Sequence, residues 1–140
     1  MGMMRLVGFN LTKINAEKML NDFSHLKVDT SINLNSVVEN KAIPEKKDTT
    51  YLEIIFMYGI NYLKKIAKIE ITGRMVVAVD KKTGKEILKN WKKKEMDEKI
   101  RLDLFNGILM KANLKALHIE EELGLPPHFR LPVLTLPKKE

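Results

Sequence analysis

The chain contains no cysteine among its 140 residues. That absence excludes disulfide bonds, thiolate nucleophiles and zinc sites built on cysteine, and because it is typical of a reducing compartment we expect a cytoplasmic protein. No apolar run is long enough to span a bilayer, and the first residues lack the basic-then-apolar pattern of a signal peptide. The sequence therefore predicts no membrane insertion and no secretory leader.

Recognisable catalytic motifs are also missing. No serine lies in a G-x-S-x-G elbow, and no glycine-rich phosphate loop is present. The histidines His25, His118 and His128 have no second histidine or carboxylate at a spacing typical of a metal site. The carboxylates of residues 120–122 are interpreted as a solvated helix face. We therefore predict that the protein is not an enzyme and uses no metal or cofactor.

The composition is that of a folded protein, with 44% hydrophobic and 31% charged residues. The length fits one domain, which we expect to cover residues 1–140. The formal net charge is +7 at pH 7, and a basic chain favours anionic partners in general without specifying which.

Alternating apolar residues predict strands in the first part of the chain, at residues 7–12, 32–39, 50–61 and 67–79. Four strands joined by short turns, without intervening helices, favour an antiparallel sheet with one or both faces covered. Residues 14–29 are mixed in composition. They fit either an irregular crossover or a short helix that Asn15 would cap.

After residues 80–84, which are expected to end the sheet, the apolar spacing becomes helical at Ile87, Leu88 and Trp91. A long helix is predicted from Asp97 to Leu123, with Gly124 as its C-cap. One apolar stripe of this helix is assigned to the fold and its interfaces, and it begins with Ile100, Leu104 and Ile108. Leucines on its other sides predict that the helix touches more than one surface.

The apolar residues of the proline-punctuated tail and of the crossover exceed what one small core would hold. Surplus apolar surface indicates an oligomer interface or a groove for a bound polypeptide. A competing hypothesis is a nucleic-acid-binding module built on lysines around Trp91. Its lysines are Lys81, Lys82, Lys85, Lys89, Lys92, Lys93 and Lys94. A third hypothesis is an oligomeric scaffold that uses its whole apolar excess between subunits.

The order of these features resembles the SecB family of protein-export chaperones. The resemblance runs through the strand segments LVGFNLTKINAEKM, VDTSINLNSVVENKA, TTYLEIIFMYGIN and AKIEITGRMVVAVD and the helical segment DLFNGILMKANLKAL. The tail ELGLPPHFRLPVLTLP is its most specific element. Well-known members of the family are acidic, whereas this chain is basic, and this difference puts docking to an export motor in doubt.

The resemblance implies an α+β fold, in which a short and a long C-terminal helix pack on one face of a four-stranded antiparallel sheet. It also implies a tetramer built as a dimer of dimers. Such a protein binds unfolded or non-native polypeptides without ATP, for protein export or for toxin–antitoxin control. We predict that the apolar groove is lined by Phe9, Leu11, Met19, Leu20, Phe23, Leu26, Trp91, Met96, Phe129, Leu131 and Leu134.

Overall fold

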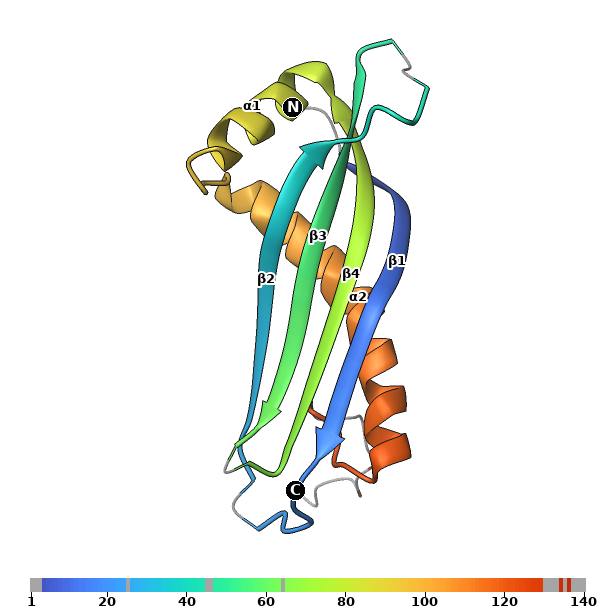
Figure 1. The fold of residues 1–140 in the computed structure, drawn as a ribbon, viewed down its shortest axis with the longest axis vertical. Helices are drawn as coiled ribbons and strands as arrows, with labels where there is room; N and C mark the ends of the chain where they lie inside the picture. The colour runs from blue at the N-terminus through green and yellow to red at the C-terminus, as the bar shows by residue number, and fades with distance from the viewer. Residues whose placement is uncertain are drawn as a thin grey trace.

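The computed structural model describes residues 4–24, 26–44, 47–63, 65–129, 134 and 136. Four strands are followed by two helices: β1 (Arg5–Lys18), β2 (Val28–Glu39), β3 (Thr49–Tyr62), β4 (Ala67–Asp80), α1 (Lys81–Trp91) and α2 (Glu98–Leu123). Figure 1 shows a long, narrow sheet with α1 at one of its ends and α2 running along it.

The sheet is antiparallel throughout, with the strand order β1-β4-β3-β2. The central pair, β3 and β4, is in register from Thr49 opposite Asp80 to Tyr62 opposite Ala67. Each edge strand is interrupted: β1 shifts register twice against β4, and β2 shifts once against β3. The predicted four-stranded antiparallel sheet is confirmed.

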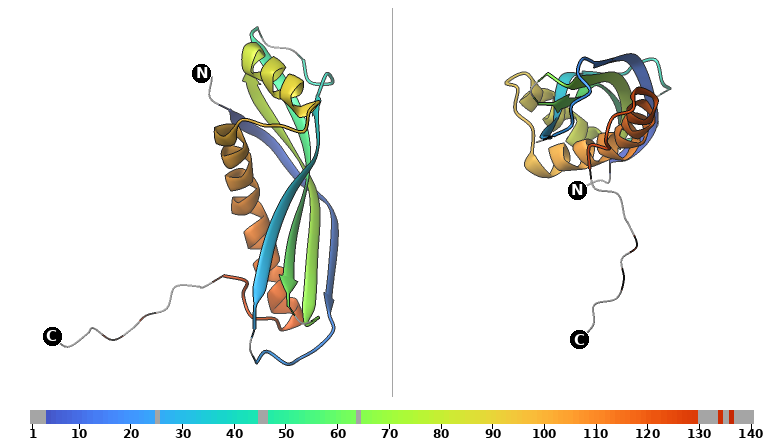
Figure 2. Two further views of the ribbon diagram at one scale, coloured as in Figure 1. Left: turned by 90° about the vertical axis from the view of Figure 1, so that its left-hand side faces the viewer. Right: turned by 90° about the horizontal axis from the view of Figure 1, so that it is seen from below.

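One face of the sheet, here called the inner face, forms the core. Alternate residues of the two central strands point to this face because successive side chains of a strand point to opposite sides. Most of them are almost completely buried: Leu52, Ile54, Phe56, Tyr58, Ile60, Tyr62, Ile69, Ile71, Met75, Val77 and Val79. Helix α2 covers this face with Leu104, Ile108, Ala112 and Ala116, which are at most 1% exposed (Figures 1 and 2). The long helix therefore packs on one face, as predicted.

Helix α1 lies against the same face, at the start of β3. A Cβ atom on its Gly84 would lie 2.9 Å from Cβ of Thr50, so only glycine allows the helix to approach the strand this closely. The prediction that residues 80–84 end the sheet is confirmed, because β4 ends at Asp80. Asp80 is the extended N-cap residue of α1, and the helix begins at Lys81.

The first strand is also longer than its apolar alternation predicted. Residues 13–18 continue β1, with Ile14 opposite Ile71 and Ala16 opposite Ile69. The alternative of a short helix capped by Asn15 was therefore wrong, because pairing with β4 provides these residues with an extended partner. The ends of α2 agree with prediction. The Asp97 side chain accepts from the Ile100 amide at 3.3 Å, and Gly124 takes the left-handed conformation with φ 65°.

Two glycines on this core should respond to alanine in opposite directions. A Cβ on Gly73 would lie 2.9 Å from Cε1 of Phe56 and 3.0 Å from the Asn10 carbonyl oxygen, whereas a Cβ on Gly107 would meet only Met75 Cε, at 3.6 Å. We expect Gly73→Ala to lower the free energy of unfolding by about 1–3 kcal/mol through overpacking. Gly107→Ala should raise it by up to about 1 kcal/mol, because alanine is favoured inside helices. Urea titration of both variants tests this, and a comparable loss in both would contradict it.

Candidate functional site

The predicted groove residues of the crossover lie where β1 ends. The Met19 and Leu20 amides donate to the Ile66 carbonyl oxygen at 2.8 and 3.1 Å, which fixes the crossover beside the turn between β3 and β4. Met19 is 49% exposed and Leu20 is 51% exposed, while Phe23 and Leu26 are half-buried against the core. These four residues, here called the crossover patch, place apolar surface in contact with solvent at this end of the sheet.

Lys18 joins the crossover to the end of α2. Its Nζ donates to the Leu123 carbonyl oxygen at 2.7 Å and lies 6.0 Å from the centre of the Phe23 ring. A cation is favoured at the C-terminus of a helix, where carbonyl groups lack partners and the helix dipole is negative. The last turn of α2 and the start of the crossover are therefore held together.

The chain after α2, residues 125–129, forms what is here called the tail segment. Leu125 is buried in the core, whereas Phe129 is 41% exposed and its ring centre lies 4.7 Å from that of His128. Among the remaining predicted residues of the tail, Leu134 is fully exposed and Leu131 lies outside the described residues. The crossover patch and the start of the tail segment thus lie at the same end of the sheet.

The other predicted groove residues lie elsewhere. Trp91 and Met96 are half-buried at the α1 end, which is separated from the crossover by the 14 residues of β4, or roughly 46 Å at about 3.3 Å per residue. Phe9 and Leu11 lie along β1 between the two ends, and Phe9 stacks on Phe56 with ring centres 5.3 Å apart. Within one chain, the predicted residues therefore occupy three places along the sheet.

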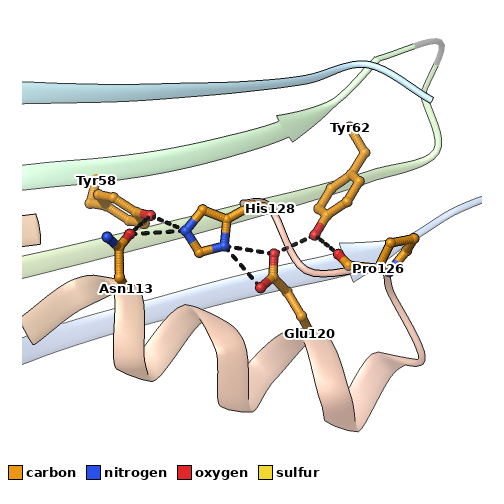
Figure 3. A network of polar contacts seen from close by, with 6 residues as sticks. All are labelled: Tyr58, Tyr62, Asn113, Glu120, Pro126 and His128. Atoms are coloured by element: carbon orange, nitrogen blue, oxygen red, sulfur yellow. Dashed lines mark hydrogen bonds and ion pairs between the residues drawn. The ribbon is translucent and has the colours of Figure 1, made fainter. Parts of the chain in front are cut away.

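A buried polar network fixes the tail segment to the sheet and to α2 (Figure 3). His128 Nδ1 lies 2.9 Å from Oε1 of Glu120, and its Nε2 lies 2.9 Å from both Asn113 Oδ1 and the Tyr58 hydroxyl. The Tyr62 hydroxyl lies within hydrogen-bond distance of both the Glu120 carboxylate and the Pro126 carbonyl oxygen, and its single proton can be donated to one of them at a time. The side chains of His128 and Glu120 are only 3% and 1% exposed, so the network satisfies groups that would be costly to bury alone.

The sequence prediction for Glu120 was wrong. It was interpreted as part of a solvated helix face together with Glu121 and Glu122, but only these two are exposed. Glu120 follows Ala112 and Ala116 at four-residue steps and therefore lies on the buried side of α2. A carboxylate in line with an apolar helix stripe was the signal that could have identified it.

The two tyrosines of the network give an alkaline pH dependence. Burial raises the pKa of both Tyr58 and Tyr62 above the ordinary value of 10.0, and the carboxylate of Glu120 raises it further. The folded state then keeps protons that the unfolded state releases above about pH 10, so the free energy of unfolding should fall as the pH rises past that value. Urea titrations between about pH 8 and pH 11 would measure this fall. Tyr62→Phe should make it shallower, and an unchanged slope would contradict the assignment.

Comparison with solved structures identifies the architecture. The chain is similar to the Mycobacterium tuberculosis SecB-like chaperone Rv1957, solved in complex with a ChAD peptide from the Rv1956 HigA1 antitoxin. The two share 13% sequence identity with a TM-score of 0.51, over 96% of this chain and 93% of that chain. The fold is SecB-like. No protein-family model and no curated protein matches the sequence, so the likeness is one of fold.

On this SecB-like scaffold, α2 presents a second apolar surface. Leu102, Met110 and Leu114 are 58%, 74% and 68% exposed and fall within an arc of roughly 120° at about 100° per residue. They lie opposite the buried residues of the helix and are here called the helix stripe. The predicted site residues do not include these three. The leucines on several sides of the helix did, however, predict that it contacts a second surface.

Within the described part of this SecB-like chain, no helix is long and apolar enough to cross a membrane. The same residues contain no cluster of three histidine, aspartate or glutamate side chains arranged to hold a metal ion. The described surface carries apolar patches and a cluster of exposed lysines on α1.

Proposed function

We propose that this SecB-like protein is an ATP-independent chaperone that holds non-native polypeptides on exposed apolar surface and catalyses no reaction. The observation that carries the proposal is that large apolar side chains stay exposed although the inner face of the sheet already has a complete core. Met19, Leu20 and Phe129 at the crossover end are 41–51% exposed, and the helix stripe is 58–74% exposed. Large apolar side chains that gather on an exposed surface are typical of a site that binds another protein.

The proposed mechanism needs no energy source. An extended polypeptide can bury its apolar side chains on the crossover patch with little dependence on sequence. Binding of the unfolded state withdraws it from aggregation by mass action, in proportion to the free chaperone concentration. Protein export and toxin–antitoxin control, both in the cytoplasm, are the proposed settings. The antitoxin peptide bound by Rv1957 supports a polypeptide partner of this kind.

We further propose that the protein acts as a tetramer, assembled as a dimer of dimers. The helix stripe is suited to this assembly, because two such helices packed against each other would bury Leu102, Met110 and Leu114, which a single chain leaves exposed. An assembly would also carry several crossover patches. A client bound at more than one of them would be held with greater avidity than one patch provides.

The proposed function is tested by suppression of the aggregation of a chemically denatured reporter protein. Met19→Asp combined with Leu20→Asp places two charges on the exposed part of the crossover patch. We expect client affinity to fall by about tenfold or more, because about 1 kcal/mol or more of apolar burial is lost at each half-exposed site.

The matched control is Asn21→Asp combined with Lys27→Gln. It makes the same change in net charge at two exposed positions of the same crossover, and it should suppress aggregation as the unaltered protein does. Equal suppression by both double variants would reject the crossover patch as the client site. A lack of suppression by the unaltered protein would reject the chaperone function itself.

A further inference from the structure

Helix α1 concentrates positive charge on one side. Lys81, Lys82, Lys85 and Lys89 of α1 and its C-cap residue Lys92 are all exposed, and they fall within an arc of roughly 100° at about 100° per residue. The opposite side packs on the sheet through Gly84 and Ile87, which are buried. The five lysines, here called the lysine face, therefore point to solvent together.

These lysines have no ion-pair partner among the described residues; the described ion pairs involve Lys68, Arg74, His118 and His128 instead. The one acidic residue of α1 is Glu86. An exposed face of one sign, without internal partners, is suited to an external partner of the opposite sign.

The placement of the lysines also opposes the stability of α1. Lys81 and Lys82 stand in its first turn, which contains no acidic residue, although the helix dipole disfavours cations there. Lys85 has a lysine four residues before it and another four residues after it, and like charges at this spacing repel each other. A bound anionic partner would offset both the repulsion between these lysines and their unfavourable position at the positive end of the helix dipole.

The geometry of the face fits an extended polypeptide. Lys81, Lys85 and Lys89 repeat at about 6 Å along the helix axis, or four residues at about 1.5 Å each. Alternate side chains of an extended chain repeat at about 6.6 Å, so every second residue of a bound segment would meet a lysine. Beside the face, Lys81 and Lys85 line a hollow of about 240 Å³ with Leu88, Thr50 and Glu39. The two lysines can donate hydrogen bonds to a bound carboxylate, and Leu88 provides an apolar contact beside it.

A nucleic acid fits the same face less well. The lysine face has no arginine and therefore no planar fork for phosphate or base edges. Single strands are usually bound by stacking bases on aromatic rings. The one nearby aromatic side chain, Trp91, is half-buried and has Lys94 Nζ 4.7 Å from its ring centre.

We infer that the lysine face is a docking surface for an extended acidic segment of a polypeptide client. The inference rests on the proposed function and adds a client preference to it. Because α1 and the crossover patch lie at opposite ends of the sheet, a client would place an apolar segment on the patch and an acidic segment on the lysine face.

The test measures binding of a fluorescent peptide of alternating glutamate and serine by anisotropy. About eight residues suffice to span α1 at about 3.3 Å per residue. The full-length protein should bind the peptide at about 50 mM salt and lose it at about 300 mM. Lys85→Glu combined with Lys89→Glu should weaken binding by at least about tenfold, and Glu39→Gln should tighten it about twofold or more.

The matched control, Lys13→Glu with Lys111→Glu, makes the same charge change at exposed positions of β1 and α2 and should bind within about twofold of the unaltered protein. If the control variant lost as much affinity for the peptide, the effect would come from net charge alone, and the lysine face would not be the docking surface. Absence of peptide binding at low salt would overturn it too. Tighter binding of a single-stranded RNA, lost in the Lys85 and Lys89 variant, would assign the face to nucleic acid instead.

Aggregation suppression and peptide binding test the crossover patch and the lysine face separately. The Lys85 and Lys89 variant should still suppress aggregation of a reporter that has no acidic segment, since its crossover patch is unchanged. Suppression without any peptide binding would reject the docking surface alone.

Discussion

Replacing His128 with alanine should lower the free energy of unfolding by about 3–5 kcal/mol, because it leaves a buried carboxylate without its partner. Glu120 is 1% exposed and His128 Nδ1 lies within 3.0 Å of both of its oxygens. The hydroxyl of Tyr62 would remain as the main donor to Glu120. Urea titration of the variant against the unaltered protein measures the loss.

The control for this effect is the double variant in which Glu120→Ala accompanies His128→Ala. Removing both members of a buried pair costs less than the two single losses added together, because no isolated charge remains. We expect the double variant to be destabilised by clearly less than that sum. A loss below about 1 kcal/mol in His128→Ala would show that the network does not hold the tail segment.

Placing two aspartates on the helix stripe should dissociate the proposed tetramer. Met110 and Leu114 are 74% and 68% exposed in the single chain, so Met110→Asp with Leu114→Asp should leave the subunit folded. Across a helix–helix contact, however, the aspartates would bury charge against apolar side chains, which costs several kcal/mol. We expect the mass measured by light scattering to fall to half of its original value or less.

Arg101→Gln with Lys111→Gln is the corresponding control. Both positions are exposed on α2 outside the arc of the helix stripe, and the change in net charge is the same. This variant should keep the mass of the unaltered protein. If the Met110 and Leu114 variant also kept that mass, or if the unaltered protein were a monomer, the helix stripe would not be the subunit interface.

The central part of the fold was predictable from local pattern alone. In β3 every second residue from Leu52 to Tyr62 is apolar, and in β4 every second residue from Ala67 to Val79 is apolar or glycine; this period of two is typical of a sheet. In α2 the apolar stripe, the capping Asp97 and the terminal Gly124 give independent and consistent signals. Where several local signals agreed, the structure followed the prediction.

The errors occurred where the deciding interaction comes from a distant part of the chain. The end of β1 alternates weakly, and its strand conformation comes from pairing with β4, from Lys13 opposite Thr72 to Lys18 opposite Ala67, far away in the sequence. Glu120 is buried because His128 and Tyr62 reach it from the tail segment and from β3. The predicted groove residues were chosen for their apolar character, but their separation along the sheet depends on how the strands are connected, which no local period contains.

The register shifts of the outer strands have a consequence for a protein that would hold aggregating chains. Both edges of the sheet are interrupted, at Leu6/Gly8 and Leu11/Lys13 in β1 and at Leu34/Ser36 in β2, while the inner pair is regular. A bulge bends a strand and breaks its row of free amides and carbonyls, so it makes a poor template for another strand. If the proposed function holds, a bound client would find no regular edge strand on which to extend the sheet, and the exposed apolar patches would not by themselves start fibril formation.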